Sequence, residues 1–412
     1  MKKCTLSILL IMLLLGLSGV SYAKVQLDYA IVGFASVLPL HAELIDAFNA
    51  SQSDIEVIMR NMPGDAENKM LEKLAVEIAT GEGPDVIYLN DKALPAFAKT
   101  GAFADITTYV ERDMKKDVAD FFPASVDAYR QGKGLYGFPG ILHAITVYYN
   151  QDLLDQAGVK YTSKWTIDDF TTIGRKTTIT NNDGVITQFG IHGLNWWPAF
   201  LPFLWGYGGD FFDPVLPDRD SFIAKADTRE SLDAFHWLEM LAQDKLIGGG
   251  AFFTGTAAMR ISNSSEAGYI TFGKNWDYGH IPIGPTGARY SRFSSTGWVM
   301  GNNSKDKEAS WQLLRYLFKS ENIQKFATSS NGLGSRRSVV GRQVQLANST
   351  VPQHKSTLLE ILEYAKPHPT CTLDVTAIEA TIRKWYGSLY TGQIDYLTAG
   401  NSLQADLKAL LP

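Results

Sequence analysis

The first residues that could do chemistry are Asn90 and Asp91, which directly follow a short apolar run at residues 86–89 (VIYL). The run is β-branched and aromatic, as is typical of a buried strand. A helix before it is expected to end at the glycine-rich breaker of residues 81–83, and a second helix is expected to begin near Leu94. This helix–strand–helix order predicts a mostly parallel α/β sheet, in which ligands lie just beyond the carboxyl ends of the strands. Asn90 and Asp91 are therefore candidate ligand-binding residues.

A second group with chemical potential is the aromatic stretch of residues 196–207 (WWPAFLPFLWGY). Phe203 and Trp205 are expected to pack in a core. The adjacent Trp196 and Trp197 cannot both face one core on a helix or strand, so at least one is expected to face a cavity or solvent. Indole faces suit the C–H faces of sugar rings, and the indole N–H offers a hydrogen bond. The stretch therefore favours a carbohydrate ligand.

Other patterns with known chemistry are incomplete or missing. Residues 132–137 (GKGLYG) fit a dinucleotide fingerprint, but Pro139 and Gly140 follow, so no helix can begin there and a turn is expected. Residues 268–274 fit the start of a phosphate-binding loop, but Asn275 replaces the Ser or Thr that holds magnesium. There is no GxSxG or HExxH sequence, and the seven histidines lack metal-ligand spacing. We expect no metal or cofactor. A glycosidase carboxylate pair stays open, because such carboxylates meet only in three dimensions.

Alternating strands and helices have to position these candidates. Strands are expected at 24–33, 55–59, 86–89, 145–149 and 278–283. Helices are expected at 41–49, 150–157, 167–176, 229–242 and 305–319, and after residue 353. A further helix is expected to begin near Asp65 and Asn68, which can cap it, and to carry an apolar pattern that ends at Ile78.

The N-terminal 23 residues have the features of a secretory signal peptide. Lys2 and Lys3 precede an apolar run at 6–17 that is too short to span a bilayer, and Ala23 ends a small-residue cleavage pattern. Cleavage there leaves 389 residues, enough for two domains, and moves the net charge from −5 to −7, because 36 basic side chains remain against 43 acidic ones. This acidic balance argues against a nucleic-acid partner. Cys371 would then be the last cysteine, so no intramolecular disulfide is expected.

Several segments along the chain carry a further signal: TGEGPDVIYLND, GKGLYGFPG with ITVYYNQDLLDQAGV, FLWGYGGDFF, FFTGTAAMRI, YGHIPIGP and GLGSRRSV. In this order they resemble the extracellular solute-binding proteins that serve sugar importers. The resemblance implies an α/β, two-lobed periplasmic-binding-protein fold with a ligand cleft between the lobes and a hinge of several segments. Lobe one would comprise residues 24–143 and 284–330, and lobe two residues 144–283 and 331–412. Chain crossings are expected near 143–147, 281–285 and 329–333.

The resemblance also implies roles for particular residues. Asp91 matches an acidic residue that accepts sugar hydroxyls, with Asn90 beside it at the strand end. His143 matches a ligand contact on the hinge side, with a packed hinge histidine as the alternative. Trp196 or Trp197 matches the aromatic platform of the second lobe.

Further positions match the family in the last third of the chain. Gly297 and Trp298 match a glycine-rich loop at the cleft, where Trp298 would pack against a ring face. Arg336 matches the basic residue of the family's GLPxR turn, where it could meet an anionic substituent. Here Gly334 stands in place of the proline and Arg337 duplicates the charge, which leaves open which arginine faces the cleft. Two more candidates, at strand ends in lobe one, are Ser36 and Asp65.

Together these features predict the periplasmic binding component of an ABC importer. It would bind a sugar or oligosaccharide by lobe closure, without catalysis, and deliver it to the permease subunits in the inner membrane. A monomer is expected. Two alternatives are kept: the same fold binding a polyol, glycerol phosphate or polyamine, and an exported glycan-degrading enzyme.

Overall fold

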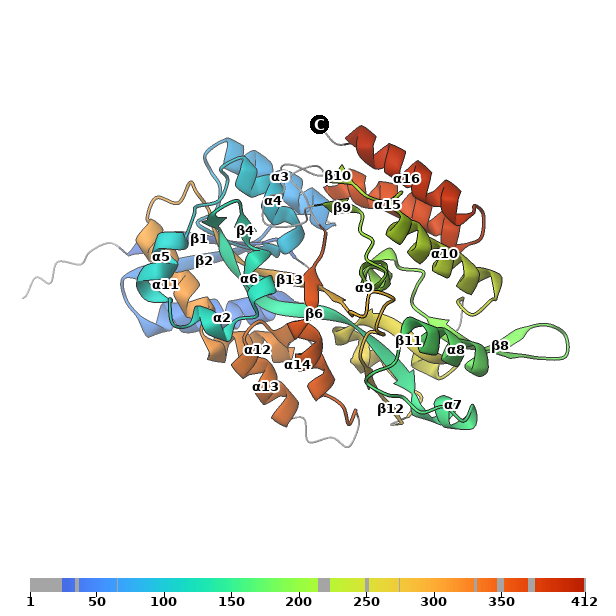
Figure 1. Cartoon of the computed structure of the whole chain (residues 1–412). Helices are drawn as coiled ribbons and strands as arrows, with labels where there is room; N and C mark the ends of the chain where they lie inside the picture. The colour runs from blue at the N-terminus through green and yellow to red at the C-terminus, as the bar shows by residue number, and fades with distance from the viewer. Residues whose placement is uncertain are drawn as a thin grey trace, which may run out of the picture.

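Two α/β lobes, joined through strand β6 in the middle of the molecule, make up the fold (Figure 1). The computed structural model describes residues 24–33, 37–64, 66–213, 223–248, 252–273, 275–329, 332–346, 352–369 and 375–410. The predicted α/β class with two lobes is confirmed, since each lobe has its own hydrophobic core. Within the described residues, no helix is long and apolar enough to cross a membrane.

The first lobe contains the parallel strands β2 (Ile55–Asn61), β1 (Val25–Ile31) and β3 (Val86–Asn90), followed by the antiparallel β13 (Ser291–Met300). The apolar run of β3 is fully buried, as its composition predicts. The lobe also contains α2 (Leu38–Ser51), α3 (Glu67–Ala79), the short helix η2 (Asp91–Ala93), α4 (Leu94–Lys99), α5 (Thr107–Asp113), α6 (Pro123–Asp127), β4 (Arg130–Gln131), β5 (Gly134–Leu135), α11 (Lys307–Leu317), α12 (Ser320–Ser329), β14 (Leu333–Gly334), α13 (Arg337–Leu346) and α14 (Ser356–Glu363).

The second lobe continues the same sheet in the order β6 (Gly137–Asn150), β11 (Ala257–Asn263), β8 (Ile186–His192) and β7 (Ile179–Thr180). β8 and β11 are parallel, and Trp196 lies shortly after the carboxyl end of β8. The remaining elements of this lobe are α7 (Gln151–Gln156), α8 (Ile167–Thr177), α9 (Leu201–Gly206), β9 (Phe212–Asp213), β10 (Ile223–Ala224), α10 (Arg229–Gln243), β12 (Trp276–Gly279), α15 (Val375–Tyr390) and α16 (Tyr396–Leu410).

Strand β6 belongs to both lobes and forms the first crossing. Its residues 137–144 pair with β13, whereas residues 145–149 pair with β11. The crossing predicted near residues 143–147 falls at this change of pairing partner. The beginning of β13 lies against the same point, because the hydroxyl of Ser291 donates to the carbonyl of Ile145 (2.6 Å).

The other two crossings lie later in the chain than predicted, and the lobe boundaries need correction. Tyr290 still packs against the second core, whereas Phe293 belongs to the first. Strand β15 (Ala365–Pro367) pairs with β13, and only α15 beyond it packs in the second core. The boundaries at 284, 330 and 331 thus move to the start of β13 and to the segment after β15.

Helices α13 and α14 explain the error in the last boundary. Val339 and Ile361 on these helices are fully buried in the first core. Helix α13 lies beside α12 of the first lobe, and α14 lies beside α13 (Figure 1). Their amphipathic patterns give each an apolar face that suits either core. The period of a helix does not show which lobe it packs against.

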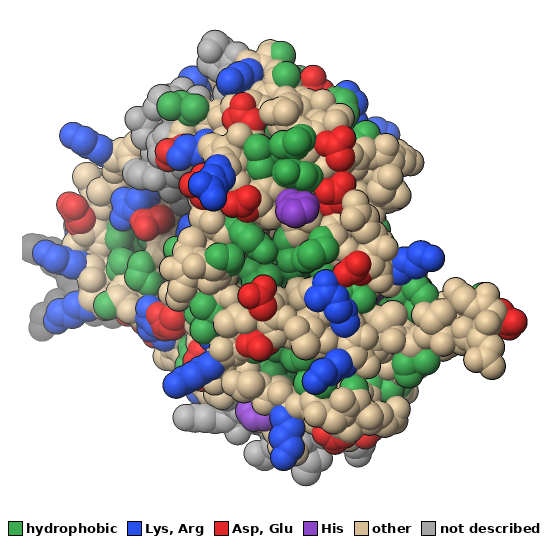
Figure 2. Space-filling view, turned by 45° about the vertical axis from the view of Figure 1, so that its right-hand side comes forward, with side chains coloured by type: hydrophobic (Ala, Val, Ile, Leu, Met, Phe, Trp, Pro, Cys, Tyr) green, Lys and Arg blue, Asp and Glu red, His purple; other side chains and the backbone are tan. Residues whose placement is uncertain are grey.

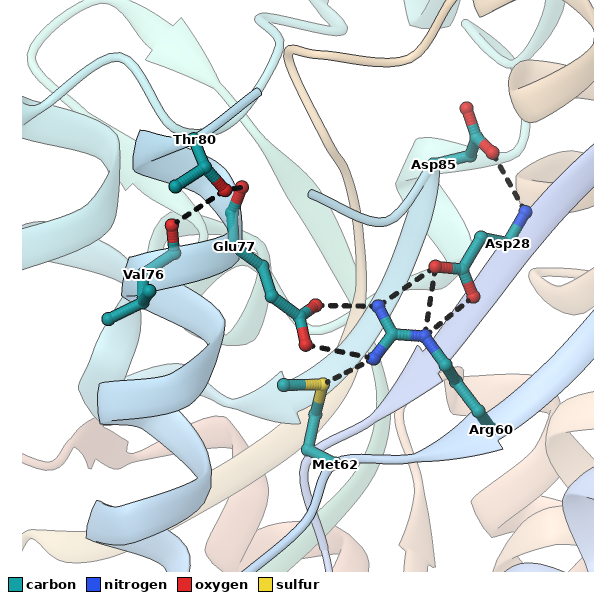
Figure 3. A network of polar contacts seen from close by, with 7 residues as sticks. All are labelled: Asp28, Arg60, Met62, Val76, Glu77, Thr80 and Asp85. Atoms are coloured by element: carbon teal, nitrogen blue, oxygen red, sulfur yellow. Dashed lines mark hydrogen bonds and ion pairs between the residues drawn. The ribbon is translucent and has the colours of Figure 1, made fainter. Parts of the chain in front are cut away.

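An ion network ties the outer strands of the first lobe to α3 (Figure 3). Arg60 on β2 bonds the carboxylate of Asp28 on β1 (2.9 Å) and that of Glu77 on α3 (2.6 Å). The Arg60 side chain is 33% exposed, so solvent screens the network. Glu77 lies near the carboxyl end of α3, far along the helix from its first turn.

We expect Arg60→Met to lower the free energy of unfolding by about 1–2 kcal/mol, because two partly exposed carboxylates lose their shared cation. Ligand affinity should not change, because Asp28, Arg60 and Glu77 do not line the cavity at the carboxyl ends of the strands. Urea unfolding and calorimetric titration measure the two quantities. A large loss of affinity at unchanged stability would contradict this assignment.

One face of the molecule carries acidic and basic side chains in mixture, with hydrophobic side chains between them (Figure 2). No extended basic area is visible on that face. This mixture agrees with the slightly acidic composition of the chain, whose formal net charge is −5.

Candidate ligand-binding site

A cavity of about 250 Å³ lies at the carboxyl ends of the first-lobe strands. Parallel strands bring residues that are distant in sequence to one edge of a sheet, which is where ligands of α/β proteins bind. Its lining consists of Val32 and Gly33 after β1, Val37 before α2, Ala66, Glu67 and Met70 at the start of α3, Tyr88 and Asn90 on β3, Ile141 and His143 on β6, and Thr296 on β13.

Asn90 and His143 are the two predicted site residues that line this cavity. The side-chain oxygen of Asn90 accepts a hydrogen bond from the backbone N–H of Lys92 (3.1 Å) and so caps the short helix η2. Because this bond occupies the oxygen, the Asn90 amide nitrogen can offer its two N–H donors to a ligand.

His143 lies where β6 passes from one lobe to the other. Its Nδ1 is buried and has no hydrogen-bond partner among the described residues. Burial, assisted by the positive charge of Arg292, lowers the pKa of His143 to about 4. The ring is therefore neutral at physiological pH, with one donor and one acceptor, and it suits a ligand hydroxyl.

Asp91 is not among the residues that line the cavity. It is 4% exposed, and its charge acts on Arg292, which is equally buried at the start of β13. Burial lowers the pKa of Arg292 to about 10, while the charges of Asp91 and Glu379 oppose this shift. A buried cation needs a carboxylate close by. The charge of Asp91 thus helps to balance Arg292, and its direct contact with the ligand stays a prediction.

Arg292 connects the first lobe to groups of the second. Its Nε donates to Nδ1 of His368 (3.1 Å), and its guanidinium carbon lies 5.8 Å from the ring centre of Trp196. Since Nδ1 accepts, the proton of the neutral imidazole resides on Nε2, which lies 3.3 Å from Oε1 of Glu379.

Sequence reasoning missed Arg292, His368 and Glu379. A single arginine in a strand, a single histidine and a helical glutamate have no characteristic spacing. The only available signal was the unusual position of Arg292 between the apolar and small residues of a central strand, where a charge requires a partner.

The two adjacent tryptophans have different environments. Trp196 is 37% exposed, which confirms the prediction that at least one of the pair faces a cavity or solvent. Trp197 is 3% exposed and packs against the rings of Phe211 and His368 in the second lobe. Trp196 is therefore the one that can offer a ring face to a ligand, and Trp197 supports it from the core.

Trp298 and Gly297 have structural roles in the first lobe. Trp298 is fully buried, and its indole N–H donates to the hydroxyl of Tyr29 (2.7 Å). The predicted packing of Trp298 against a ligand ring is therefore corrected, because no ring face is accessible. Gly297 allows close strand packing, since a Cβ there would lie 2.1 Å from the carbonyl oxygen of Phe138. The loop predicted at this point is the middle of β13.

Arg336 and Arg337 both bind residues outside the cavity. Arg336 is buried, donates to the carbonyl of Phe318 (3.0 Å) and pairs with Asp120 (3.3 Å). Arg337 pairs with Glu363. The prediction that one of these arginines faces the cleft is therefore not supported by their contacts. The remaining candidates, Ser36 and Asp65, lie outside the described residues.

The buried neutral histidines predict how stability depends on pH. Burial lowers the pKa of His41 to about 3, and its Nδ1 shares a hydrogen bond with the Tyr29 hydroxyl (2.6 Å). In the unfolded chain His41 binds a proton near pH 6.5, so the folded state loses relative stability as the pH falls below that value. At pH 5 the expected loss is about 2 kcal/mol for such a group.

Melting temperatures at pH 7.5 and pH 5 test this expectation. Wild-type protein should melt at a lower temperature at pH 5, and His41→Gln, which keeps an acceptor for Tyr29, should lose less over the same interval. Carboxylates with a lowered pKa, such as Glu379 at about 2, act only below this window. An equal loss in both proteins would contradict the role of His41.

Two lobes, three crossing segments and a cavity beside the crossings define a protein that holds a small solute between its lobes. A sequence model of the bacterial extracellular solute-binding protein family matches residues 38–324. The chain belongs to this family. It is accordingly a solute-binding component and not an enzyme, which removes the glycan-degrading alternative.

Similar proteins come from several bacteria. A binding protein of Brucella abortus is 27% identical over 314 residues, which cover 72% of each chain. A maltooligosaccharide ABC transporter solute-binding lipoprotein of Streptococcus pneumoniae is 23% identical and covers 93% of this chain and 88% of its own. The structure of the sugar-binding protein MalE from Xanthomonas citri matches with a TM-score of 0.79 at 22% identity, over 94% of this chain and 97% of that one. This last likeness confirms the fold.

Proposed function

We propose that this protein captures a sugar or short oligosaccharide and delivers it to the permease subunits of an ABC importer. The observation that carries the proposal is a cavity lined by the neutral hydrogen-bonding groups Asn90, His143 and Thr296. The exposed indole of Trp196 lies outside this lining, 5.8 Å from the guanidinium carbon of Arg292. Polar groups would bond the hydroxyls, and the indole would cover a ring face. The named ligands of the similar proteins, maltooligosaccharide and sugar, support the same class.

The charges around the cavity favour a neutral ligand over glycerol phosphate. Lys92 lies 4.0 Å from Glu67 and 3.5 Å from Glu379, and the charges of Asp91 and Glu379 act on Arg292. With Arg383, which lies 3.9 Å from Glu379, three cations thus face three carboxylates. A phosphate would have to break these pairs to find a cation. The polyol and polyamine alternatives are compatible with this balance and are separated by experiment.

The size of the cavity favours one or two sugar rings. Ligand pockets for drug-sized molecules commonly measure roughly 300–1,000 Å³, whereas this one measures about 250 Å³. Longer oligosaccharides would have to extend between the lobes beyond the described lining.

We further propose that the protein works as a monomer in the periplasm, after cleavage of the basic and apolar segment 1–23. The family consists of extracellular solute-binding proteins of bacteria. The segment itself lies outside the described residues, so its role rests on its sequence pattern.

A ligand screen on residues 24–412 tests the proposed function. Melting temperature is measured with mono- and oligosaccharides, polyols, glycerol phosphate and polyamines, because a ligand that binds only the folded state raises it. We expect the largest shift from a mono- or disaccharide, with binding confirmed by calorimetry. A shift from glycerol phosphate or a polyamine alone, with none from any sugar, would overturn the sugar assignment and leave the fold untouched.

A further inference from the structure

A chain of three charged side chains spans the space between the lobes beside the cavity. Nζ of Lys92 lies 3.5 Å from Oε1 of Glu379 and 4.0 Å from Oε2 of Glu67. Lys92 follows β3 in the first lobe, and Glu67 begins α3 in the same lobe and lines the cavity. Glu379 is on α15, whose buried side chains pack in the second core. The contact between Lys92 and Glu379 therefore joins groups that belong to different lobes.

Glu379 is held in place by groups around it. Nε2 of His368 lies 3.3 Å from its Oε1, and Arg383 lies 3.9 Å from its other oxygen on the next turn of α15. His368 is itself fixed by the hydrogen bond from Arg292 (3.1 Å). The Glu379 side chain is 21% exposed, so its carboxylate is partly withdrawn from water and interacts more strongly than a surface group would.

Lys92 is fixed by the same turn that lines the cavity. Its backbone N–H donates to the side chain of Asn90 (3.1 Å), which caps η2. A ligand that bonds the Asn90 amide would therefore act on the turn that carries Lys92. The cavity lining and the contact between the lobes share one short segment of chain.

We propose that Lys92 and Glu379 are positioning residues whose ion pair sets the closed arrangement of the lobes around the ligand. An ion pair between two lobes exists only when they are close, so it stabilises the closed state relative to the open one. Closure then depends in part on the protein's own charges, and the ligand has to supply less of the free energy. The part of this inference that concerns ligand affinity rests on the proposed function.

The variants Lys92→Met, Glu379→Gln and their combination test the proposal. X-ray scattering on the ligand-free protein at low and high salt measures the radius of gyration, and stopped-flow binding measures ligand dissociation. We expect each single variant to have a larger radius of gyration than wild type at low salt and to release the ligand about 3- to 10-fold faster. The double variant should have a radius of gyration and a dissociation rate no larger than those of the more strongly affected single variant, because both substitutions remove the same contact. High salt should reproduce the effect in wild type.

A matched control comes from an ion pair within one lobe. Lys384 on α15 pairs with Asp406 on α16 (3.2 Å), so Lys384→Met removes a charge from the same helix without touching the other lobe. This variant should leave both measurements unchanged, and Lys92→Arg should behave like wild type. The proposal would be overturned if the effects of the two single substitutions on the radius of gyration and the dissociation rate added up in the double variant. It would also be overturned if the single variants gave the same values as Lys384→Met.

The two readouts separate this inference from the proposed function. If no sugar binds to wild type but the radius of gyration responds to Lys92→Met and Glu379→Gln, the proposed function fails and the ion pair stands. If a sugar binds and neither the radius nor the dissociation rate responds, the function stands and the ion pair has no such role.

Discussion

Trp196→Ala is expected to weaken sugar binding by about 1–3 kcal/mol, roughly 5- to 150-fold, without lowering the melting temperature. The neighbouring substitution, Trp197→Ala, is expected to lower the free energy of unfolding by about 3–5 kcal/mol. The difference follows from exposure, since 37% of Trp196 but only 3% of Trp197 is accessible. Removing the first ring takes away a contact surface, and removing the second leaves a cavity among Phe211 and His368.

Calorimetric titration and urea unfolding on both variants measure the contrast. Trp196→Phe serves as a control, because it keeps an aromatic face and should recover most of the affinity. If Trp196→Ala bound the sugar as tightly as wild type, the second-lobe platform would have to be another side chain. If both variants unfolded equally easily, Trp196 would be a packing residue like its neighbour.

Asp91→Ala is expected to lower the free energy of unfolding by about 3–5 kcal/mol, because it removes the stronger of the two carboxylate charges, those of Asp91 and Glu379, that act on the buried Arg292. The double variant Asp91→Ala/Arg292→Met should lose less free energy of unfolding than the two single variants lose together, since it removes both charges. Both residues are nearly inaccessible, at 4% exposure each. Thermal and urea unfolding of the three variants form a complete double-mutant cycle.

The opposite result has an equally clear meaning. If Asp91→Ala kept the wild-type melting temperature but lost sugar affinity, Asp91 would contact the ligand directly, as the sequence resemblance implies. Asp91→Asn is the milder comparison, because it keeps the volume of the side chain and removes only the charge.

Much of the fold could be predicted from local patterns. The apolar run of β3, the amphipathic periods of α3 and α10 and the breakers between them are signals that extend over a few residues. These patterns placed most of the alternating strands and helices close to their observed positions. They did not show that α13 and α14 pack in the first lobe, because the core that a helix joins depends on contacts with residues distant in sequence.

The site was harder to predict than the fold for the same reason. Asn90 was found because it ends a strand, and His143 because it matches a hinge-side contact of the family that the sequence resembles. Trp298 was assigned to the cleft on residue type, yet its ring completes the core around Tyr29. Arg292 was overlooked, since its importance comes from burial beside Asp91 and His368, which are far apart in sequence. Burial and partners in space decide such roles, and spacing in one chain does not show them.

The position of β13 between β3 and β6 has a consequence for how the protein is made. The first lobe begins with β1, but its sheet cannot close until the residues up to Met300 are available. At the usual pace of synthesis, the interval between the ends of β6 and β13 lasts roughly 8–30 s. A nascent chain that waits this long for its central strand stays unfolded, and contacts between such distant segments form slowly. For a protein that we propose is exported, this delay keeps the chain in the extended form that can be threaded across a membrane.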